Sequence, residues 1–190
     1  MSGFRRLGEA IVHQGHLWKV VVAEFEAPNT ERFRRDIVRS PGSVGVVPLL
    51  FDAEGLPSVV LVRQYRAAYD RPVIEIPAGM RDVPGEPAAE TGRRELAEEA
   101  GLDADEIVHL LDLLPAPGMT DAVTSIFLAT GCSAVDHDRH GPEEHEMDLI
   151  HVPFDEALAM IDRGDITDAK TVAGLLATER RLRLDAAPAG

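Results

Sequence analysis

The segment from Gly79 to Leu102, GMRDVPGEPAAETGRRELAEEAGL, restricts the fold more than any other part of the chain. It predicts a helix over residues 87–100, because proline favours the first helical position and glycine favours the end. Glu95, Glu98 and Glu99 fall three and four residues apart in this helix, so their carboxylates share one face. These like charges repel one another, and we expect a cation beside them. Mg²⁺ is the predicted cation, with Mn²⁺ as the alternative, and a phosphate-containing substrate would bind through it.

The remaining elements predict an α+β protein. Apolar, β-branched runs predict strands at 16–25, 31–39, 43–51, 58–66, 73–76, 109–114, 123–128 and 149–152. Two further helices are expected at 153–163 and 169–184. The turn signal at 52–57 predicts a hairpin between the third and fourth strands. Helices placed among antiparallel and mixed strands are typical of an α/β/α sandwich with a mixed sheet.

The break at Pro41-Gly42 predicts two parts. Residues 1–41 are expected to form an antiparallel β arm, and residues 42–190 one further domain. A chain of 190 residues is long enough for that domain and its hydrophobic core.

Charge and cysteine content exclude several classes of partner. The formal charge of −14 argues against a sequence-independent nucleic-acid grip and against docking on anionic lipid. Cys132 is the single cysteine, so no internal disulfide can form and a reducing cytoplasm is expected. The first ten residues lack the apolar core of a signal peptide, and no apolar run reaches the roughly 20 residues of a membrane helix.

The acidic segment resembles the Nudix box, G-x5-E-x7-R-E-U-x-E-E-x-G-U with U aliphatic. The matching positions are Gly79, Glu86, Arg94, Glu95, Leu96, Glu98, Glu99, Gly101 and Leu102. One departure is the six residues, instead of five, between Gly79 and Glu86, in a loop where insertions are tolerated. A second is Gly92 inside the helix, which costs about 1 kcal/mol relative to alanine.

Flanking motifs resemble the ADP-ribose pyrophosphatase branch of that family. They are LVRQYR (61–66), EIPAGM (75–80), Pro117 within LPAPGMTD, PEEHEMD (142–148) and GDITDAKT (164–171). The resemblance implies Mg²⁺-dependent hydrolysis of ADP-ribose to AMP and ribose 5-phosphate by a homodimer whose arms cross between subunits. Ala122 departs from the branch, which usually carries a glutamate there, so Asp121 replaces it or the substrate differs. A nucleotide sugar such as GDP-mannose is therefore the alternative substrate, and a Nudix-fold binding module without turnover is the third reading.

The resemblance also implies the metal and catalytic residues. Metal ligands are expected to be the Ala78 carbonyl, Glu95, Glu99 and Glu146. Arg94 and Glu98 complete the catalytic set, with Arg94 ion-paired to Glu86. Glu144 is the expected general base that deprotonates the attacking water, and Glu143 is its rival.

The expected substrate-binding residues are Trp18, Arg35, Arg66, Met80 and Asp121. Arginine suits bidentate phosphate contacts, and Arg34 is a rival to Arg35. Trp18 either stacks on adenine or packs in the arm. His137, His140 and His145 lack the cysteines and regular spacing of a zinc site, so they predict a polar loop.

Overall fold

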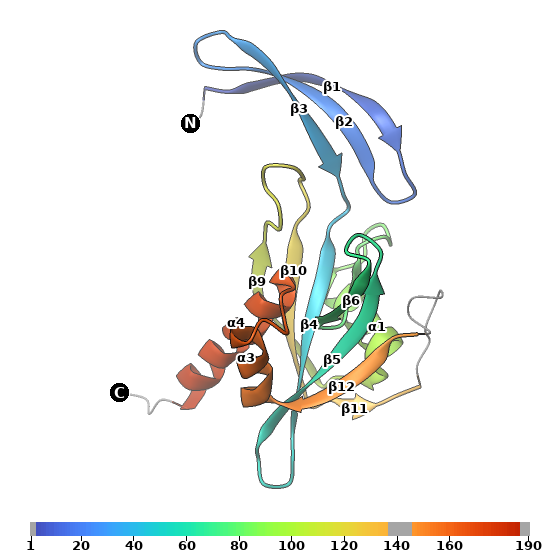
Figure 1. Ribbon diagram of the computed structural model, residues 1–190, viewed down its shortest axis with the longest axis vertical. Helices are drawn as coiled ribbons and strands as arrows, with labels where there is room; N and C mark the ends of the chain where they lie inside the picture. The colour runs from blue at the N-terminus through green and yellow to red at the C-terminus, as the bar shows by residue number, and fades with distance from the viewer. Residues whose placement is uncertain (1–2, 137–145, 187–190) are drawn as a thin grey trace. The chain divides into compact units, whose positions relative to one another are not determined.

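The computed structural model describes residues 3–136 and 146–186 (Figure 1). The chain divides into two compact units. Unit 1 comprises the residues up to Gly42 together with Leu114–Val123, and unit 2 comprises Ser43–Leu113 together with the residues from Thr124 onward. The inclusion of Leu114–Val123 in the unit of the N-terminal strands was not predicted from the sequence. The division into an arm at 1–41 and a domain at 42–190 stays a prediction.

Unit 1 is a three-stranded antiparallel sheet in the order β1-β2-β3. Its strands are β1 (Arg5–Gln14), β2 (Lys19–Glu26) and β3 (Arg32–Arg39). The predicted strands at 16–25 and 31–39 correspond to β2 and β3, whereas β1 was not predicted. Nine of the ten β1 residues are exposed, so the strand lacks the alternation of buried and exposed positions that predicts a strand.

The segment Leu114–Val123 is hydrogen-bonded to the end of β3. The Val38 amide donates to the Met119 carbonyl at 2.9 Å. The Thr120 hydroxyl donates to the Val38 carbonyl at 2.8 Å. These bonds and the bridge between Val38 and Thr120 make the segment part of unit 1.

Unit 2 is built on a seven-stranded mixed sheet. Its main path is β12-β5-β4-β10-β9; β6 pairs with β5 and β7 with β4. The strands are β4 (Ser43–Phe51), β5 (Pro57–Arg66), β6 (Arg71–Glu75), β7 (Ala78–Met80), β9 (Glu106–Leu113), β10 (Thr124–Thr130) and β12 (Asp148–Pro153). β10 runs parallel to β4, and the predicted hairpin is confirmed by antiparallel pairing of β4 with β5. A separate two-stranded sheet joins β8 (Leu102–Asp103) to β11 (Ser133–Ala134).

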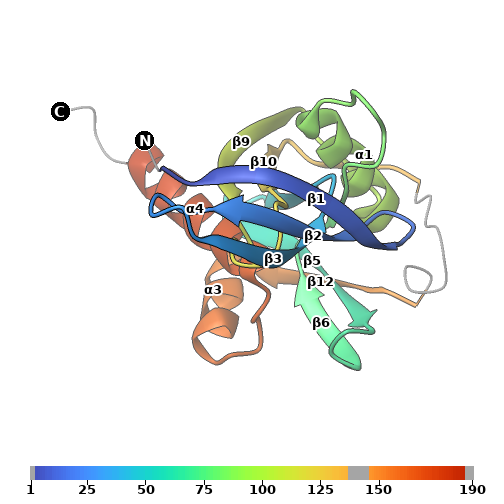
Figure 2. The same ribbon diagram turned by 90° about the horizontal axis from the view of Figure 1, so that it is seen from above.

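Helices cover both faces of the unit 2 sheet. Figure 2 shows α1 (Ala88–Ala100) on the opposite side from α3 (Phe154–Asp162) and α4 (Ala169–Ala186). On β4, Val44 and Val46 pack in a buried cluster with Leu96 of α1. Val47 and Leu49 point to the other face and pack with residues of α3 and α4. The predicted α/β/α sandwich and its three helices are confirmed. No helix within 3–136 and 146–186 is both long enough and apolar enough to cross a membrane.

Close packing explains the glycine inside α1. A Cβ atom built on Gly92 would lie 3.1 Å from Cγ2 of Val46 on β4, a tight contact. Glycine therefore lets the helix approach the sheet closely, which offsets its low helix propensity. The helix ends as predicted, because Gly101 adopts the left-handed conformation with φ 62° and its amide donates to the Ala97 carbonyl.

Candidate active site

The backbone that enters α1 is hydrogen-bonded at successive residues. The Ile76 amide donates to the Thr171 hydroxyl at 2.8 Å, and the Pro77 carbonyl accepts from the Val46 amide at 2.9 Å. The Ala78 amide donates to Oε2 of Glu99 at 2.8 Å. Three different elements therefore hold the segment that carries the Ala78 carbonyl.

Gly79 is required because the Glu95 carboxylate lies against it. A Cβ atom on Gly79 would overlap that carboxylate, so any larger residue would displace Glu95. The loop between Gly79 and Glu86 has one residue more than the Nudix pattern, but Glu86 still forms its ion pair with Arg94. Glu86 accepts from the Thr91 hydroxyl at 2.8 Å and lies 3.5 Å from Nε of Arg94.

Arg94 lies at the centre of the carboxylate cluster. Its Nη1 is 2.8 Å from Oε1 of Glu95 and 3.0 Å from Oε2 of Glu98. Its Nη2 lies 3.5 Å from Oδ1 of Asp82. Nε is buried and has no hydrogen-bond partner among the residues that the structure describes, since the Glu86 contact is a longer ion pair. One guanidinium therefore serves four carboxylates.

The cluster has more negative charge than its surroundings stabilise. Burial raises the pKa of Glu95 to about 7; Arg94 opposes this shift and Glu98 adds to it. The pKa of Arg94 is raised although burial opposes it, because Glu95 and its neighbours favour the cation. A buried carboxylate that is only partly ionised at neutral pH would be stabilised as the anion by a nearby cation.

The donor set fits a hard divalent cation by its chemistry. Glu95 and Glu99 are buried on one face of α1, and the Ala78 carbonyl belongs to the residue whose amide binds Glu99. All three supply oxygen, which Mg²⁺ and Mn²⁺ prefer. Within 3–136 and 146–186 no three His, Cys, Asp or Glu side chains converge in a metal-binding geometry. Arg94 is the cation that pairs with Glu95 in this structure.

The expected general base lies outside the described residues. Glu144, its rival Glu143 and the three loop histidines all fall in 137–145. Glu146 is described: it is exposed and lies two residues before β12, which pairs with β5. The roles predicted for Glu144 and Glu146 stay predictions.

Arg66 is bound to a buried glutamate that the sequence did not single out. Its Nε and Nη2 donate to the two oxygens of Glu75 at 2.6 and 2.7 Å. The Arg66 side chain is 37% exposed, so it can still reach a ligand. Lys170 of α4 also binds Glu75. Met80, another predicted substrate contact, is half-buried at the end of β7.

Unit 1 contains a cavity of about 510 Å³. Alternate residues of β3 line it together with aromatic side chains and the loop that follows Leu114: Phe4, Phe25, Phe33, Arg35, Ile37, Arg39, Pro117, Gly118, Met119, Thr120 and Asp121. The Arg35 guanidinium lies 4.7 Å from the centre of the Phe33 ring, within cation–π range. Of the two rival arginines, Arg35 lines this cavity. The period-2 alternation of RFRRDIVR could have indicated this face.

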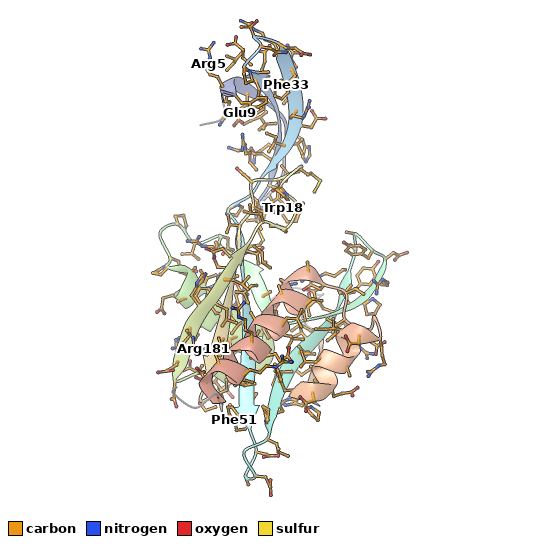
Figure 3. The ribbon with its side chains drawn as sticks, turned by 90° about the vertical axis from the view of Figure 1, so that its left-hand side faces the viewer. Arg5, Glu9, Trp18, Phe33, Phe51 and Arg181 are labelled. Atoms are coloured by element: carbon orange, nitrogen blue, oxygen red, sulfur yellow. The ribbon has the colours of Figure 1, made fainter. Side chains whose placement is uncertain are left out.

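Two other predicted substrate contacts, Asp121 and Trp18, also lie in unit 1. The Asp121 carboxylate accepts from Arg39 at 3.0 Å and from the Ser40 amide at 3.1 Å. Trp18 is 54% exposed. Figure 3 shows it at the opposite end of the three-stranded sheet from Phe33. The aromatic cluster of Phe4, Phe25 and Phe33 was not predicted as part of a site.

The fold and this acidic helix define the chain as a hydrolase of the Nudix type. A model of the NUDIX domain matches residues 40–175. The ADP-ribose pyrophosphatase of Mycobacterium tuberculosis is 34% identical over 174 residues, which cover 92% of this chain and 82% of the relative. A methanol dehydrogenase activator from Bacillus methanolicus is 34% identical over 161 residues, covering 85% of this chain and 84% of the relative.

Two further comparisons are consistent with the Nudix family. The GDP-mannose pyrophosphatase of Enterobacter sp. is 33% identical over 135 residues, which cover 67% of this chain and 69% of the relative. The crystal structure of an ADP compounds hydrolase shares the fold with a TM-score of 0.82 at 22% identity, covering 96% of each chain. The chain belongs to the Nudix family.

Proposed function

We propose that the protein is a Mg²⁺-dependent pyrophosphatase that hydrolyses ADP-ribose to AMP and ribose 5-phosphate. The observation that carries the proposal is the arrangement of Glu95, Glu99 and the Ala78 carbonyl, with more negative charge than Arg94 compensates. Relatives named ADP-ribose pyrophosphatase in M. tuberculosis and Bacillus subtilis support the choice of substrate.

The residues of this chain have distinct tasks in the proposed reaction. Water adds to one phosphorus of the pyrophosphate, the bridging P–O bond breaks, and Glu144 takes the proton of the water. Arg66, held by Glu75, binds a phosphate oxygen. Glu95, Glu99 and Ala78 would hold the metal with Glu146, and Arg94 with Glu98 orients the carboxylates. A bound Mg²⁺ neutralises charge that develops on the phosphate oxygens.

Substrate selection is proposed for the side chains of the unit 1 cavity. The Arg35 guanidinium packs on the Phe33 ring in this cavity and supplies a planar cation that suits a nucleobase or ribose. Met80 and Trp18 are proposed as further substrate contacts.

Release of AMP from ADP-ribose with and without Mg²⁺ tests the proposal. The wild-type protein should release AMP only when the metal is present. The Glu99→Gln variant, with an unchanged circular dichroism spectrum, should release far less. Undetectable release by the wild-type protein would reject ADP-ribose as a substrate.

A nucleotide sugar is the second candidate substrate. Position 122 carries no carboxylate, and the neighbouring Asp121 already binds Arg39 and the Ser40 amide. Relatives named GDP-mannose pyrophosphatase point the same way. A panel of ADP-ribose and GDP-mannose at fixed Mg²⁺ separates the two by kcat/KM. Tight binding of ADP-ribose in calorimetry without cleavage of either compound would favour the binding module.

We also propose a homodimer. Unit 1 exposes Ile11 and Val12 on β1 and Trp18 in the turn between β1 and β2, and a partner subunit could cover these apolar side chains. Light scattering at micromolar concentration should give twice the mass of one chain, and a monomeric mass would contradict the proposal. A cytoplasmic location stays a prediction.

A further inference from the structure

A closed network of polar contacts connects α4 to the segment that carries the metal-binding carbonyl. The Ile76 amide donates to the Thr171 hydroxyl at 2.8 Å, and this hydroxyl donates to Oδ2 of Asp168 at 2.7 Å. Lys170 binds the same Asp168 oxygen at 3.0 Å and also binds Oε2 of Glu75. Since Glu75 and Ile76 are neighbours in the chain, the network begins and ends on the same stretch of backbone.

The groups in this network are buried and mutually satisfied. Glu75, Ile76 and Thr171 are almost completely buried. Burial opposes ionisation of Glu75, yet Arg66 and Lys170 hold its pKa below the ordinary value. The Thr171 hydroxyl accepts one hydrogen bond and donates another, as a buried hydroxyl should. Asp168 lies one residue before α4 and also accepts from the Thr171 amide in the first turn, as an N-cap side chain does.

The network ends beside the predicted ligands. Two residues after Ile76, the Ala78 amide binds Glu99, and Gly79 lies against Glu95. The Glu75 carboxylate also fixes the guanidinium of Arg66. A displacement of Glu75 or Ile76 would therefore move both the Ala78 carbonyl and the arginine proposed to bind phosphate.

We propose that Lys170 and Thr171 at the start of α4 are positioning residues for the metal and phosphate site. They act through Glu75 and Ile76 and make no contact with the metal themselves. The proposal rests on the proposed function for its metal, and it adds a requirement outside the Nudix box. The helix α4, almost seventy residues beyond the box, would then determine how tightly the metal is bound.

The test compares threonines on the same helix. Thr171→Val removes the hydroxyl that holds Ile76, and Thr171→Ser restores it. Thr178→Val is the matched control, because Thr178 is also fully buried on α4 but its hydroxyl has no partner among the described residues. For the second arm, Lys170→Met removes the charge beside Glu75 and Lys170→Arg retains it.

Two readouts do not require turnover. Calorimetry with Mn²⁺ should show a Kd about tenfold weaker in Thr171→Val and Lys170→Met, as expected when a partner of the ligand-bearing segment is lost. Hydrogen exchange of the metal-free protein should be faster at the Ile76 amide in Thr171→Val. Thr178→Val should match the wild-type protein in both measurements, and Thr171→Ser and Lys170→Arg should recover at least part of the loss. In activity assays the Mg²⁺ requirement should rise while kcat at saturating Mg²⁺ changes less.

Other results would overturn the proposal. Folded Thr171→Val and Lys170→Met proteins that bind Mn²⁺ like the wild-type protein would reject a positioning role. Equal weakening in Thr178→Val would show that general loss of helix packing is responsible. If Thr171→Val does not fold, the pair Lys170→Met and Lys170→Arg decides. A wild-type protein that binds Mn²⁺ but cleaves no ADP-ribose would reject the proposed substrate and leave this test valid.

Discussion

Glu75 and Glu95 are both buried carboxylates in unit 2, but their surroundings differ. The side chain of Glu75 is 3% exposed and that of Glu95 is 11% exposed. Glu75 binds two cations, Arg66 and Lys170, and its pKa is lowered. Glu95 binds Arg94, which also pairs with other carboxylates, and its pKa is raised to about 7. Burial alone therefore does not determine the charge state, because the balance of nearby cations and carboxylates also shifts the pKa.

This difference separates a structural ion network from a site that can take up a cation. In the network around Glu75, two cations face the carboxylates of Glu75 and Asp168. Around Arg94, one cation faces four carboxylates. Perturbed carboxylates of the second type are typical of functional sites. Variants of Glu99 should accordingly affect activity most, whereas variants of Glu75 should lower stability in addition to disturbing the site that its network positions.

The largest effect is expected from Glu99→Gln in the carboxylate cluster. The change removes a proposed metal ligand but keeps an oxygen that can accept from the Ala78 amide. Since partners outside the ligand shell already cost about 10–100-fold, loss of a ligand should lower kcat/KM by at least about 100-fold. Steady-state kinetics with ADP-ribose measure kcat/KM, and thermal unfolding measures stability. Activity within about fivefold of wild type would assign Glu99 to the structural class.

The next effect is expected from Glu75→Gln, and it should appear in stability. The variant leaves Arg66 and Lys170 without their buried anion, so the free energy of unfolding should fall by about 3 kcal/mol. Urea denaturation measures the change. Glu54→Gln, at an exposed turn, is the control and should unfold like the wild-type protein. An unchanged free energy of unfolding in Glu75→Gln would show that burying Lys170 and Arg66 does not require the Glu75 carboxylate.

The sequence predicted the acidic cluster but not the Glu75 network, because the members of the cluster are close in sequence and those of the network are far apart. The carboxylates of α1 fall within five residues, so helical periodicity alone places them on one face. Lys170 and Glu75 are 95 residues apart, and no local pattern links them. Hydrophobic strands and glycine or proline boundaries were predicted for the same local reason. The exposed β1 and the segment Leu114–Val123 depend on tertiary pairing, and they were missed.

The raised pKa of Glu95 gives a pH-dependent prediction for the metal-free protein. A carboxylate whose pKa is near 7 in the folded state and near 4.5 when unfolded favours folding below pH 4.5. That contribution is lost as the pH rises through about 7, because the charged form is less stable when buried. Glu95→Gln should therefore raise the free energy of unfolding by about 2 kcal/mol at pH 8 relative to wild type, and little at pH 4. Chemical denaturation at both pH values measures the gain. An equal gain in the free energy of unfolding at pH 4 and pH 8 would show that packing, and not ionisation of Glu95, is responsible.

The smallest effect is expected from an ion pair outside both clusters whose shortest N–O distance is similar to that of Arg66 and Glu75. Arg63 lies three residues before Arg66 on β5, and its Nη2 is 2.6 Å from Oδ2 of Asp148. Both side chains of this pair are more than half exposed, so water screens the charges. Arg63→Gln should change the free energy of unfolding by less than about 0.5 kcal/mol. Urea denaturation beside Glu75→Gln makes the comparison direct. Equal losses would mean that hydrogen-bond geometry, and not burial, makes the Glu75 network stabilising.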